Sequence, residues 1–506
     1  MRRASLFMTV MSLLGLAALQ LAPVQAASTD EVTLVADPLS TWQVSGKVFA
    51  LAYAGGVVYA GGSFGSVRPP GSPAGTNEQV RTDFAAFNAS TGAPTNCAPN
   101  ITAPSGVTST ITALELSPDG TTLYVGGRFT SVNGITVGNM VALDTASCSV
   151  KRGFPKFNGA VNAFGVTAGT IYAGGSFTKS NNQPRTRLAA FSATGQLGSW
   201  APSVDDTVQA ITVAPDVSRV YVGGSFVQTN GASAQGIVAL NPDSGATVQT
   251  FPGWIDGARE TVKALTHDDQ YFYLASEGSG KGQFDGRIAA DVYTGAMHWK
   301  DACKGATQDI EPYQGVLYSA SHNHDCSTNP GGFPDYAMDG RQHLVAETID
   351  DHTILPWFPD TDEGIGGNGL GPHALVMAAG QLWVGGEFTT VNKSPQQGLT
   401  RFPAGPDVGA PPKVTPSATS PAAGQVQVTW PASWDRDDGL LTYRLYRVGT
   451  QGPIYTTQVE SRYWSESTIS FTDSGLPSGS TQSYKVDVSD GINTSQRSAA
   501  ATVTVS

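Results

Sequence analysis

The chain has 506 residues, of which only 14% are charged, and it carries a formal net charge of −12. This acidic balance argues against nucleic acid as a partner and against binding to an anionic membrane surface. Low charge with 59 glycines is typical of an extracellular all-β protein, and the length predicts a large domain followed by a small one.

The chain begins with the features of a secretory signal peptide. Arg2 and Arg3 precede an apolar stretch over residues 6–21, and a small-residue cleavage site follows at residues 24–26. These features predict a signal peptide over residues 1–27 and a secreted, extracellular protein. The sequence leaves the general and the twin-arginine export routes open. No later apolar stretch is long enough for a transmembrane helix, so no membrane insertion is expected.

A strand-like motif, Tyr-x-Gly-Gly-x-Phe, returns along the chain at intervals of 45 to 65 residues. Clean copies begin at Tyr59, Tyr124, Tyr172, Tyr221 and Trp383, and degenerate copies begin at Tyr273 and Tyr318. In each repeat an apolar strand precedes the motif and two further short strands follow it, separated by glycine or asparagine turns. Four strands to a repeat are typical of one blade, so the repeats predict a seven-bladed β-propeller over residues 28–405.

The paired glycines of the motif have a structural explanation. Two glycines permit a β-bulge, or a close approach of neighbouring sheets where side chains do not fit. We therefore assign the clean copies to the architecture of the propeller.

The N-terminal segment is expected to close the ring. The last repeat has its third strand near residues 399–402 and then passes into proline-rich sequence without a fourth strand. Residues 39–44 resemble the missing strand, so we predict that they pair there and remove an open sheet edge.

A proline-rich segment over residues 406–416 predicts an extended, semi-rigid linker. Beyond it, apolar and polar residues alternate in short runs over residues 417–506, which is typical of a β-sandwich. This part resembles a fibronectin type III domain, with Trp430 in the place of the core tryptophan and Leu476 with Tyr484 in the tyrosine-corner region. We expect this domain to act as a spacer or adaptor.

The repeats resemble the delta-60 type of β-propeller repeat in secreted bacterial proteins, especially those of actinobacteria. The resemblance rests on Tyr-Val-Gly-Gly-x-Phe with Thr-x-Val-Asn, and on later stretches at residues 299–301, 317–326, 369–373 and 382–388. It implies a fold and export but no established activity, and it assigns no catalytic residue.

Four cysteines in an exported chain predict two disulfide bonds. Of the three possible connectivities we favour Cys97–Cys148 and Cys303–Cys326, because each pair is close along the repeat array.

Ionisable residues gather in the fifth to seventh repeats, where the motif breaks down. Loops after the second strand and crossings between blades emerge on one propeller face, and five of the seven histidines lie between residues 322 and 373. We predict a ligand-binding face there, made of His322, His324, Asp325, Asp301, Asp309, Asp362, Glu363 and His373.

The run His322-x-His324-Asp325 has two interpretations. Alternate residues of an extended chain point the same way, so both imidazoles could hold one metal such as zinc, with a carboxylate completing the site. Alternatively, these residues hydrogen-bond a long loop, and this interpretation is favoured because no third ligand is fixed by spacing. The run from Asp360 to Glu363 only partly matches a calcium loop, so no cofactor is predicted.

Two classes of function remain open for this face. The first is recognition of an extracellular glycan or cell-surface protein by a monomeric, non-catalytic chain. The alternative is a polysaccharide-active enzyme, a glycosidase or lyase, for which paired carboxylates are available. A purely structural surface protein is a third interpretation. The sequence contains no nucleophile elbow, phosphate-binding loop or dinucleotide fingerprint.

Overall fold

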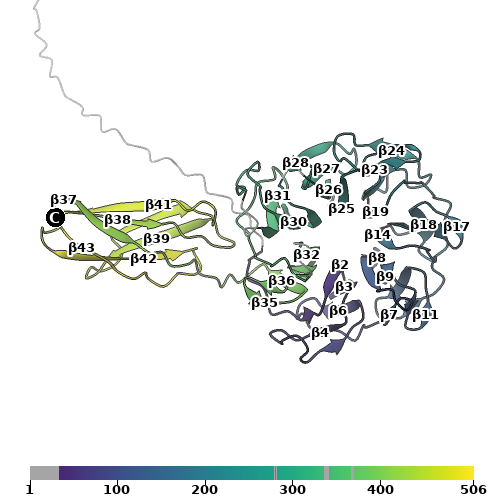
Figure 1. Cartoon of the computed structure of the whole chain (residues 1–506), viewed down its shortest axis with the longest axis horizontal. Coiled ribbons are helices and arrows are strands. Elements are labelled where there is room, and N and C mark those ends of the chain that lie inside the picture. Colours follow the sequence, from purple (N-terminus) through teal and green to yellow (C-terminus); the bar gives the residue numbers. More distant parts are fainter. Residues whose placement is uncertain (1–33, 279, 281, 302, 336–340, 366–369) are drawn as a thin grey trace, which may run out of the picture.

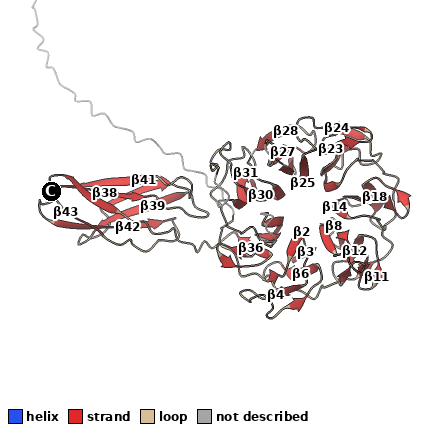
Figure 2. Cartoon of the chain, in the orientation of Figure 1, coloured by secondary structure: helices blue, strands red, loops and turns tan. Residues whose placement is uncertain are grey.

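The computed structural model describes residues 34–278, 280, 282–301, 303–335, 341–365 and 370–506. The regular elements of these residues are all β-strands (Figure 2), and none of the described residues forms a helix that could cross a membrane. The predicted signal peptide, residues 1–27, lies outside the described residues.

Between residues 47 and 403 the chain forms consecutive antiparallel sheets of three or four strands, arranged around a centre (Figure 1). The innermost strands are β2 (Lys47–Ala54), β8 (Thr110–Leu116), β14 (Val161–Val166), β19 (Val208–Val213), β25 (Glu260–His267), β29 (Thr307–Tyr313) and β32 (Pro372–Ala378). Each innermost strand contacts that of the next sheet, and β32 contacts β2, so the ring closes as a β-propeller.

Each sheet continues outward from its innermost strand, and we name each sheet after that strand. The second strands, which carry the Tyr-x-Gly-Gly-x-Phe motif, are β3 (Val57–Ser63), β9 (Thr122–Arg128), β15 (Thr170–Gly175), β20 (Val220–Gly224), β26 (Tyr271–Gly278), β30 (Val316–Asn323) and β33 (Gln381–Gly386). The third strands are β6 (Phe84–Asn88), β12 (Met140–Asp144), β18 (Leu188–Ser192), β23 (Ile237–Leu240), β27 (Arg287–Asp291), β31 (Gln342–Thr348) and β36 (Leu399–Pro403). Fourth strands are β13 (Val150–Lys151), β24 (Thr247–Thr250) and β28 (Met297–Asp301).

The two glycines of the motif have different steric roles. A Cβ on Gly61 would overlap the Ile111 side chain of the next sheet, whereas a Cβ on Gly62 would overlap the carbonyl of Lys47 beside a bulge in β2. The first glycine therefore allows neighbouring sheets to approach, and the second accommodates the bulge. In the degenerate copies alanine replaces the first glycine, at Ala275 and Ala320.

The N-terminal segment runs beside the outer edge of β36. The backbone N–H of Val35 donates to Pro403 at 2.9 Å, and that of Leu39 donates to Arg401 at 2.8 Å. The pairing thus begins upstream of the predicted residues 39–44. Residues beyond Leu39 diverge because β1 (Gln43–Val44) pairs with β4 (Ser66–Arg68) instead, and β4 also pairs with β5 (Gln79–Val80).

Residues 417–504 form a second unit of two packed sheets (Figure 1). One sheet contains β37 (Ser417–Ala422), β38 (Gln425–Pro431) and β41 (Thr468–Ser474), and the other contains β40 (Tyr455–Glu460), β39 (Leu440–Arg447), β42 (Thr481–Ser489) and β43 (Ala501–Thr504). Trp430, Tyr443 and Tyr484 are buried in its core, and the Tyr484 hydroxyl donates to the Asp473 carboxylate at 2.8 Å.

This second unit contacts the propeller through aromatic side chains. Tyr463 and Trp464 pack against Phe333 and Phe358, and the Trp464 and Phe358 ring centroids lie 4.7 Å apart. The backbone of Phe358 also exchanges hydrogen bonds with Arg436, at 2.7 and 3.0 Å. The second unit is therefore docked onto the propeller, whereas a spacer would be joined to it by the linker alone.

Both predicted disulfide bonds are present, which confirms that connectivity. Cys97 is bonded to Cys148, and Cys303 is bonded to Cys326, with Cα–Cα distances of 5.4 and 4.2 Å. The second bond lies in the apolar cluster that contains Phe333 and Phe358.

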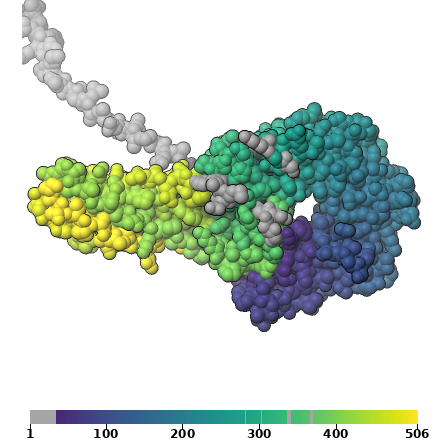
Figure 3. All heavy atoms as spheres, viewed as in Figure 1, coloured from purple at the N-terminus to yellow at the C-terminus, as the bar shows by residue number. Residues whose placement is uncertain are grey.

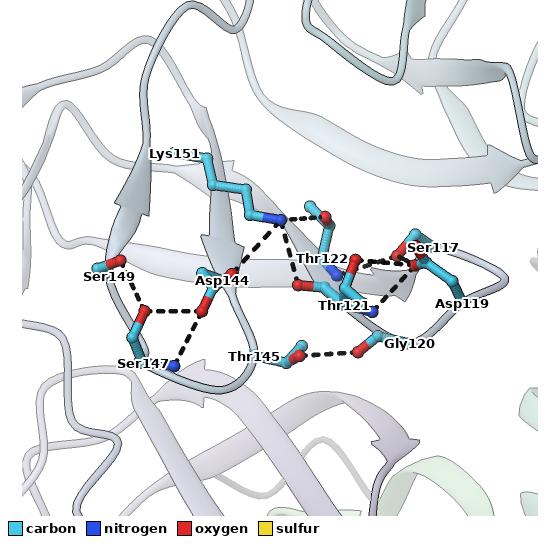
Figure 4. A network of polar contacts seen from close by, with 10 residues as sticks. All are labelled: Ser117, Asp119, Gly120, Thr121, Thr122, Asp144, Thr145, Ser147, Ser149 and Lys151. Atoms are coloured by element: carbon cyan, nitrogen blue, oxygen red, sulfur yellow. Dashed lines mark hydrogen bonds and ion pairs between the residues drawn. The ribbon is translucent and has the colours of Figure 1, made fainter.

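A polar network forms the turn between β8 and β9, at the end of the sheet away from the first residues of β8 (Figure 4). Asp119 accepts hydrogen bonds from Ser117 and Thr121, which lower the pKa of its carboxyl to about 2. Lys151 bridges this turn to the next one, donating to Thr122 at 2.6 Å and lying 3.6 Å from Asp144. Asp119 therefore has a local structural role.

Candidate functional site

The residues predicted from the fifth to seventh repeats mostly bind separate partners. Asp301 is fully buried and accepts hydrogen bonds from Arg287 and from the Cys303 backbone N–H. His324 lies 3.1 Å from Asp335. Asp301 therefore contributes to the interior of the protein and does not face a ligand.

Two predicted residues of the loop between β31 and β32 are also engaged locally. Asp362 accepts hydrogen bonds from the backbone N–H groups of Thr389, at 2.5 Å, and Thr390, at 3.1 Å. Glu363 accepts a hydrogen bond from Arg341 at 2.7 Å. These contacts order the loop that enters β32.

Asp325 closes the blade-crossing loop near the disulfide bond. Burial alone would raise the pKa of the Asp325 carboxyl, but hydrogen bonds from Lys304 and Ser327 outweigh it and lower this pKa to about 2. The carboxylate is thus ionised and already paired.

His322 and the predicted metal set are not assembled into a metal centre. Burial, together with smaller contributions from Arg341 and His343, lowers the pKa of His322 to about 4, so its imidazole is neutral at physiological pH. Among the described residues, one group brings three ligand atoms within 4.8 Å of one another, namely Asp407, Asp437 and Asp438. That group lies at the junction with the second unit and excludes His322, His324 and Asp325.

A cavity opens instead at the mouth of the central channel, on the same face as the predicted residues. Every innermost strand has a β-bulge there, and the residue in the bulge has no pairing partner in the neighbouring strand. These residues are Phe49, Thr112, Asn162, Gln209, Lys263, Gln308 and His373. We call them the mouth ring. They line a cavity of 380 Å³ together with Lys47, Leu370 and Glu387, and Figure 3 shows the opening at the centre of the ring of sheets.

The mouth carries two lysine–glutamate pairs. Lys263 lies 3.0 Å from Glu277, and Lys47 forms an ion pair with Glu387. Both glutamates occupy the fifth position of the motif, one in a degenerate copy and one in a clean copy. Burial alone would raise the pKa of both carboxyls. Contacts with Lys263 and Gln308 outweigh burial at Glu277, and contacts with His373 and Lys47 outweigh it at Glu387, so the pKa of each carboxyl is lowered.

His373 is the predicted residue that lines this cavity. Its side chain is 10% exposed, its ring centroid is 5.2 Å from that of Phe49, and Nε2 lies 3.5 Å from Glu387. That separation is too long for a good hydrogen bond, and Nε2 has no hydrogen-bond partner among the described residues. The imidazole therefore packs between Phe49 and Glu387 at the mouth.

The channel below the mouth ring is a continuous cavity of 420 Å³. Its polar wall residues include three acids, Glu115, Asp309 and Glu311, which project from β8 and β29. The surrounding protein disfavours their charged forms and raises the pKa of Glu115 and of Asp309 to about 7 and that of Glu311 to about 8. Solvent in the channel moderates these shifts, since Glu115 is exposed to it.

Backbone groups of β32 orient the two acids of β29. The N–H of Leu375 donates to Asp309 and the N–H of Met377 donates to Glu311, each at 2.8 Å. Sequence reasoning identified Asp309 and the mouth-ring residue His373, but it missed Glu115, Glu311 and the other six residues of the mouth ring. The available signal was the register of each first strand. The mouth-ring residue follows the first buried residue in six of the strands and the second, Val262, in β25, and its identity differs between repeats.

Comparisons with known proteins give a local family match. A family model described as a β-propeller domain of unknown function, DUF5122, matches residues 169–197, and no curated protein matches the chain. Three solved chains illustrate the structural similarity. A chain of the mitotic checkpoint complex has 12% identity and a TM-score of 0.45, with 74% of this chain and 97% of that chain covered.

The other two solved chains are enzymes. Dihydro-heme d1 dehydrogenase has 14% identity and a TM-score of 0.35, with 72% of this chain and 74% of that chain covered. Oligogalacturonate lyase from Vibrio parahaemolyticus has 9% identity and a TM-score of 0.39, with 71% of this chain and 98% of that chain covered. The family description and the ring of sheets agree on a β-propeller.

Proposed function

We propose that this chain is a secreted seven-bladed β-propeller with a C-terminal fibronectin type III domain, and that it binds an extracellular carbohydrate at the mouth of its central channel. The consecutive sheets between residues 47 and 403 support the blade number. The two-sheet unit with buried Trp430 and Tyr484 supports the C-terminal assignment. Two disulfide bonds support an oxidising, extracytoplasmic environment.

The observation that carries the binding function is the convergence of the mouth ring on one cavity. Asn162, Gln209 and Gln308 offer amides that both donate and accept hydrogen bonds, as vicinal sugar hydroxyls require. Phe49 adds an apolar ring, and Thr112 adds a hydroxyl. A largely pre-formed concave site with a few convergent polar groups is the usual form of a small-ligand site.

The paired charges at the mouth fit recognition of a polar ligand. Lys47 and Lys263 are each held by a glutamate, so these side chains are positioned before a ligand arrives. A pre-organised site loses less conformational entropy on binding. A degenerate copy supplies Glu277 and a clean copy supplies Glu387, each at the variable fifth position of the motif.

Binding at the mouth is tested with a glycan array followed by calorimetry on the full mature chain. Asn162→Ala and Gln209→Ala should each weaken binding roughly tenfold, because each removes a hydrogen-bonding side chain from the cavity wall. Gln270→Ala is the matched control, since Gln270 is exposed in the turn after β25 at the other end of the channel. Absence of any glycan ligand, or equal affinity in Gln209→Ala and the parent protein, would contradict the proposal.

A glycosidase is the second candidate, and the difference between the pKa values of the Asp309 and Glu277 carboxyls favours it. Burial raises the pKa of Asp309 to about 7, as a general acid requires, whereas the Lys263 and Gln308 contacts of Glu277 outweigh its burial and keep its pKa low. Turnover of a polysaccharide panel that is abolished by Asp309→Asn, with binding retained, would support catalysis. Binding without turnover would support recognition alone.

A further inference from the structure

Acidic side chains converge where the N-terminal segment, the linker and the second unit meet. Asp407 belongs to the linker, and Asp437 and Asp438 belong to the loop between β38 and β39. One carboxylate oxygen from each of these three residues lies within 4.8 Å of the other two. Calcium–oxygen bonds are about 2.3–2.6 Å long, so oxygens that share one ion lie up to about 5 Å apart. The three carboxylates are therefore within reach of a single calcium ion.

These acids are held in place by the surrounding protein. Asp407 and Asp437 are only 6% and 9% exposed. The backbone N–H of Ala36 donates to Asp437 at 2.5 Å, and that of Gly409 donates to Asp407 at 3.0 Å. The side chain of Asn493, between β42 and β43, also donates to the Asp407 carboxylate at 2.8 Å. Because these partners come from distant parts of the sequence, the arrangement depends on the docked position of the second unit.

An independent observation at Asp490 points to a ligand at the same place. Oδ1 of Asp490 accepts hydrogen bonds from the backbone N–H groups of Ile492 and Asn493, at 2.7 and 2.5 Å. Oδ2 is buried from solvent and has no hydrogen-bond partner among the described residues. The charge of Asp490 contributes to raising the pKa of Asp407, so the two carboxyls are neighbours. A buried carboxylate oxygen without a partner is costly, and a cation or its bound water would satisfy it.

The charges next to this group are acidic as well. Burial, followed by the nearby Asp435 and Asp37 carboxyls, raises the pKa of Asp437. Arg436 lies between two of the acids in the sequence, but it donates to the Phe358 carbonyl of the propeller at 3.0 Å. Like charges gathered in a buried junction are unfavourable, and a bound cation reverses this effect. Oxygen ligands select hard cations such as Ca²⁺, whereas zinc sites usually contain nitrogen or sulfur.

We propose that this junction binds a calcium ion through Asp407, Asp437 and Asp438, with the free oxygen of Asp490 available to a water molecule on the ion. Calcium ligands include both carboxylates and waters. The ion would tie the linker to the β38–β39 loop, and would thereby hold the second unit against the propeller. This site is separate from the mouth of the channel, and its existence does not depend on the carbohydrate-binding function.

The test is calorimetry on the full mature chain, freed of metal with a chelator and titrated with calcium chloride. We expect a Kd of about 10⁻⁴ to 10⁻³ M, the range of extracellular calcium modules. Magnesium should bind at least about tenfold more weakly, because Mg²⁺ needs a tighter octahedral shell and loses its waters reluctantly. Asp437→Asn keeps the shape of the side chain and removes its charge, so calcium affinity should fall about tenfold or more.

A second variant and a control keep the test independent of folding. Asp438→Asn changes a partly exposed residue and should weaken calcium binding as Asp437→Asn does. Glu460→Gln is the matched control, since Glu460 is exposed on β40 of the same unit and should leave the affinity unchanged. Calcium should also slow proteolysis of the linker in the parent protein, because an ion bound to the docked state favours that state.

Three results would overturn the proposal. The first is the absence of calcium binding by the parent protein, and the second is equal affinity in the parent protein, Asp437→Asn and Asp438→Asn. The third is equal affinity for calcium and magnesium, which would contradict the assignment of the ion. Calcium binding that leaves proteolysis of the linker unchanged would overturn the role of the ion in docking.

Discussion

Arg287 donates a hydrogen bond from Nε to Oδ2 of Asp301 at 2.7 Å in the fully buried interior of the β25 sheet. The same guanidinium lies 3.0 Å from Glu347 and donates to Ser319 at 2.9 Å, so it joins this sheet to the β29 sheet. Positions equivalent to Arg287 in other sheets are apolar, for example Phe84. A buried ionic cluster therefore replaces part of the apolar packing between these sheets.

Removal of the Arg287 guanidinium should be strongly destabilising. Arg287→Leu leaves Asp301 buried without a cation, and we expect the free energy of unfolding to fall by about 3–5 kcal/mol. The triple variant Arg287→Leu, Asp301→Asn, Glu347→Leu should recover most of this loss, because no buried charge remains. Denaturant unfolding followed by fluorescence measures both. If the triple variant is no more stable than Arg287→Leu, the ionic cluster stabilises the fold beyond the neutralisation of its own buried charges.

The sequence identifies architecture better than it identifies the site. The Tyr-x-Gly-Gly-x-Phe spacing reveals the repeat because each glycine is required by close backbone approach, as at Gly61 and Gly62. The degenerate copy at Tyr318 suggested a functional site, but Ser319 in that copy accepts a hydrogen bond from Arg287 in the interior. A departure from a repeat can thus reflect an alternative core.

The mouth ring was harder to predict because its members share a register and not a residue type. Phe49, Asn162 and Lys263 occupy equivalent positions, yet their side chains differ in size and charge. Within the cluster of histidines, His324 and His322 lie in different local environments. Of that set, His373 reaches the cavity, since it occupies the mouth-ring position of β32.

Asp325 should contribute stability that is lost in acid. Its folded-state pKa of about 2 is below the ordinary value of 3.8, so the contribution is present above the unfolded pKa and disappears as the pH falls through the folded one. Because its partner Lys304 is largely exposed and screened by solvent, we expect about 1 kcal/mol. Asp325→Asn should be less stable than the parent protein at about pH 7 and similar to it at about pH 2. A difference that does not change with pH would contradict this account.

The channel acid Asp309 should have the opposite effect on stability in the absence of ligand. Its raised pKa means that the folded state binds the proton more tightly than the unfolded chain, so stability falls as the pH rises from about 4 to about 7. Asp309→Asn keeps an acceptor for the Leu375 N–H and removes the charge. We expect it to be about 1–2 kcal/mol more stable than the parent protein at about pH 8, with solvent in the channel limiting the gain.

The comparison is made by thermal and denaturant unfolding across pH, with Asp119→Asn as control. Hydrogen bonds to Asp119 lower its pKa, so its removal should not produce the same gain at alkaline pH. Equal stability of Asp309→Asn and the parent protein at all pH values would show that the channel acid is fully solvated.

The docked position of the second unit depends on Trp464, whose ring packs edge-on against Phe358 at 4.7 Å and Phe333 at 5.5 Å. Trp464→Ala removes this aromatic contact, which corresponds to about 2 kcal/mol of apolar burial, and leaves the core around Trp430 intact. We expect the linker around residues 406–416 to become more sensitive to proteolysis and the two units to unfold in separate transitions. Ile492→Ala is the matched control, since Ile492 is 73% exposed in the same unit. The contrary outcome is that Trp464→Ala unfolds in one transition and its linker resists proteolysis as in the parent protein. The hydrogen bonds between Arg436 and Phe358 would then be sufficient to hold the two units together without the aromatic contact.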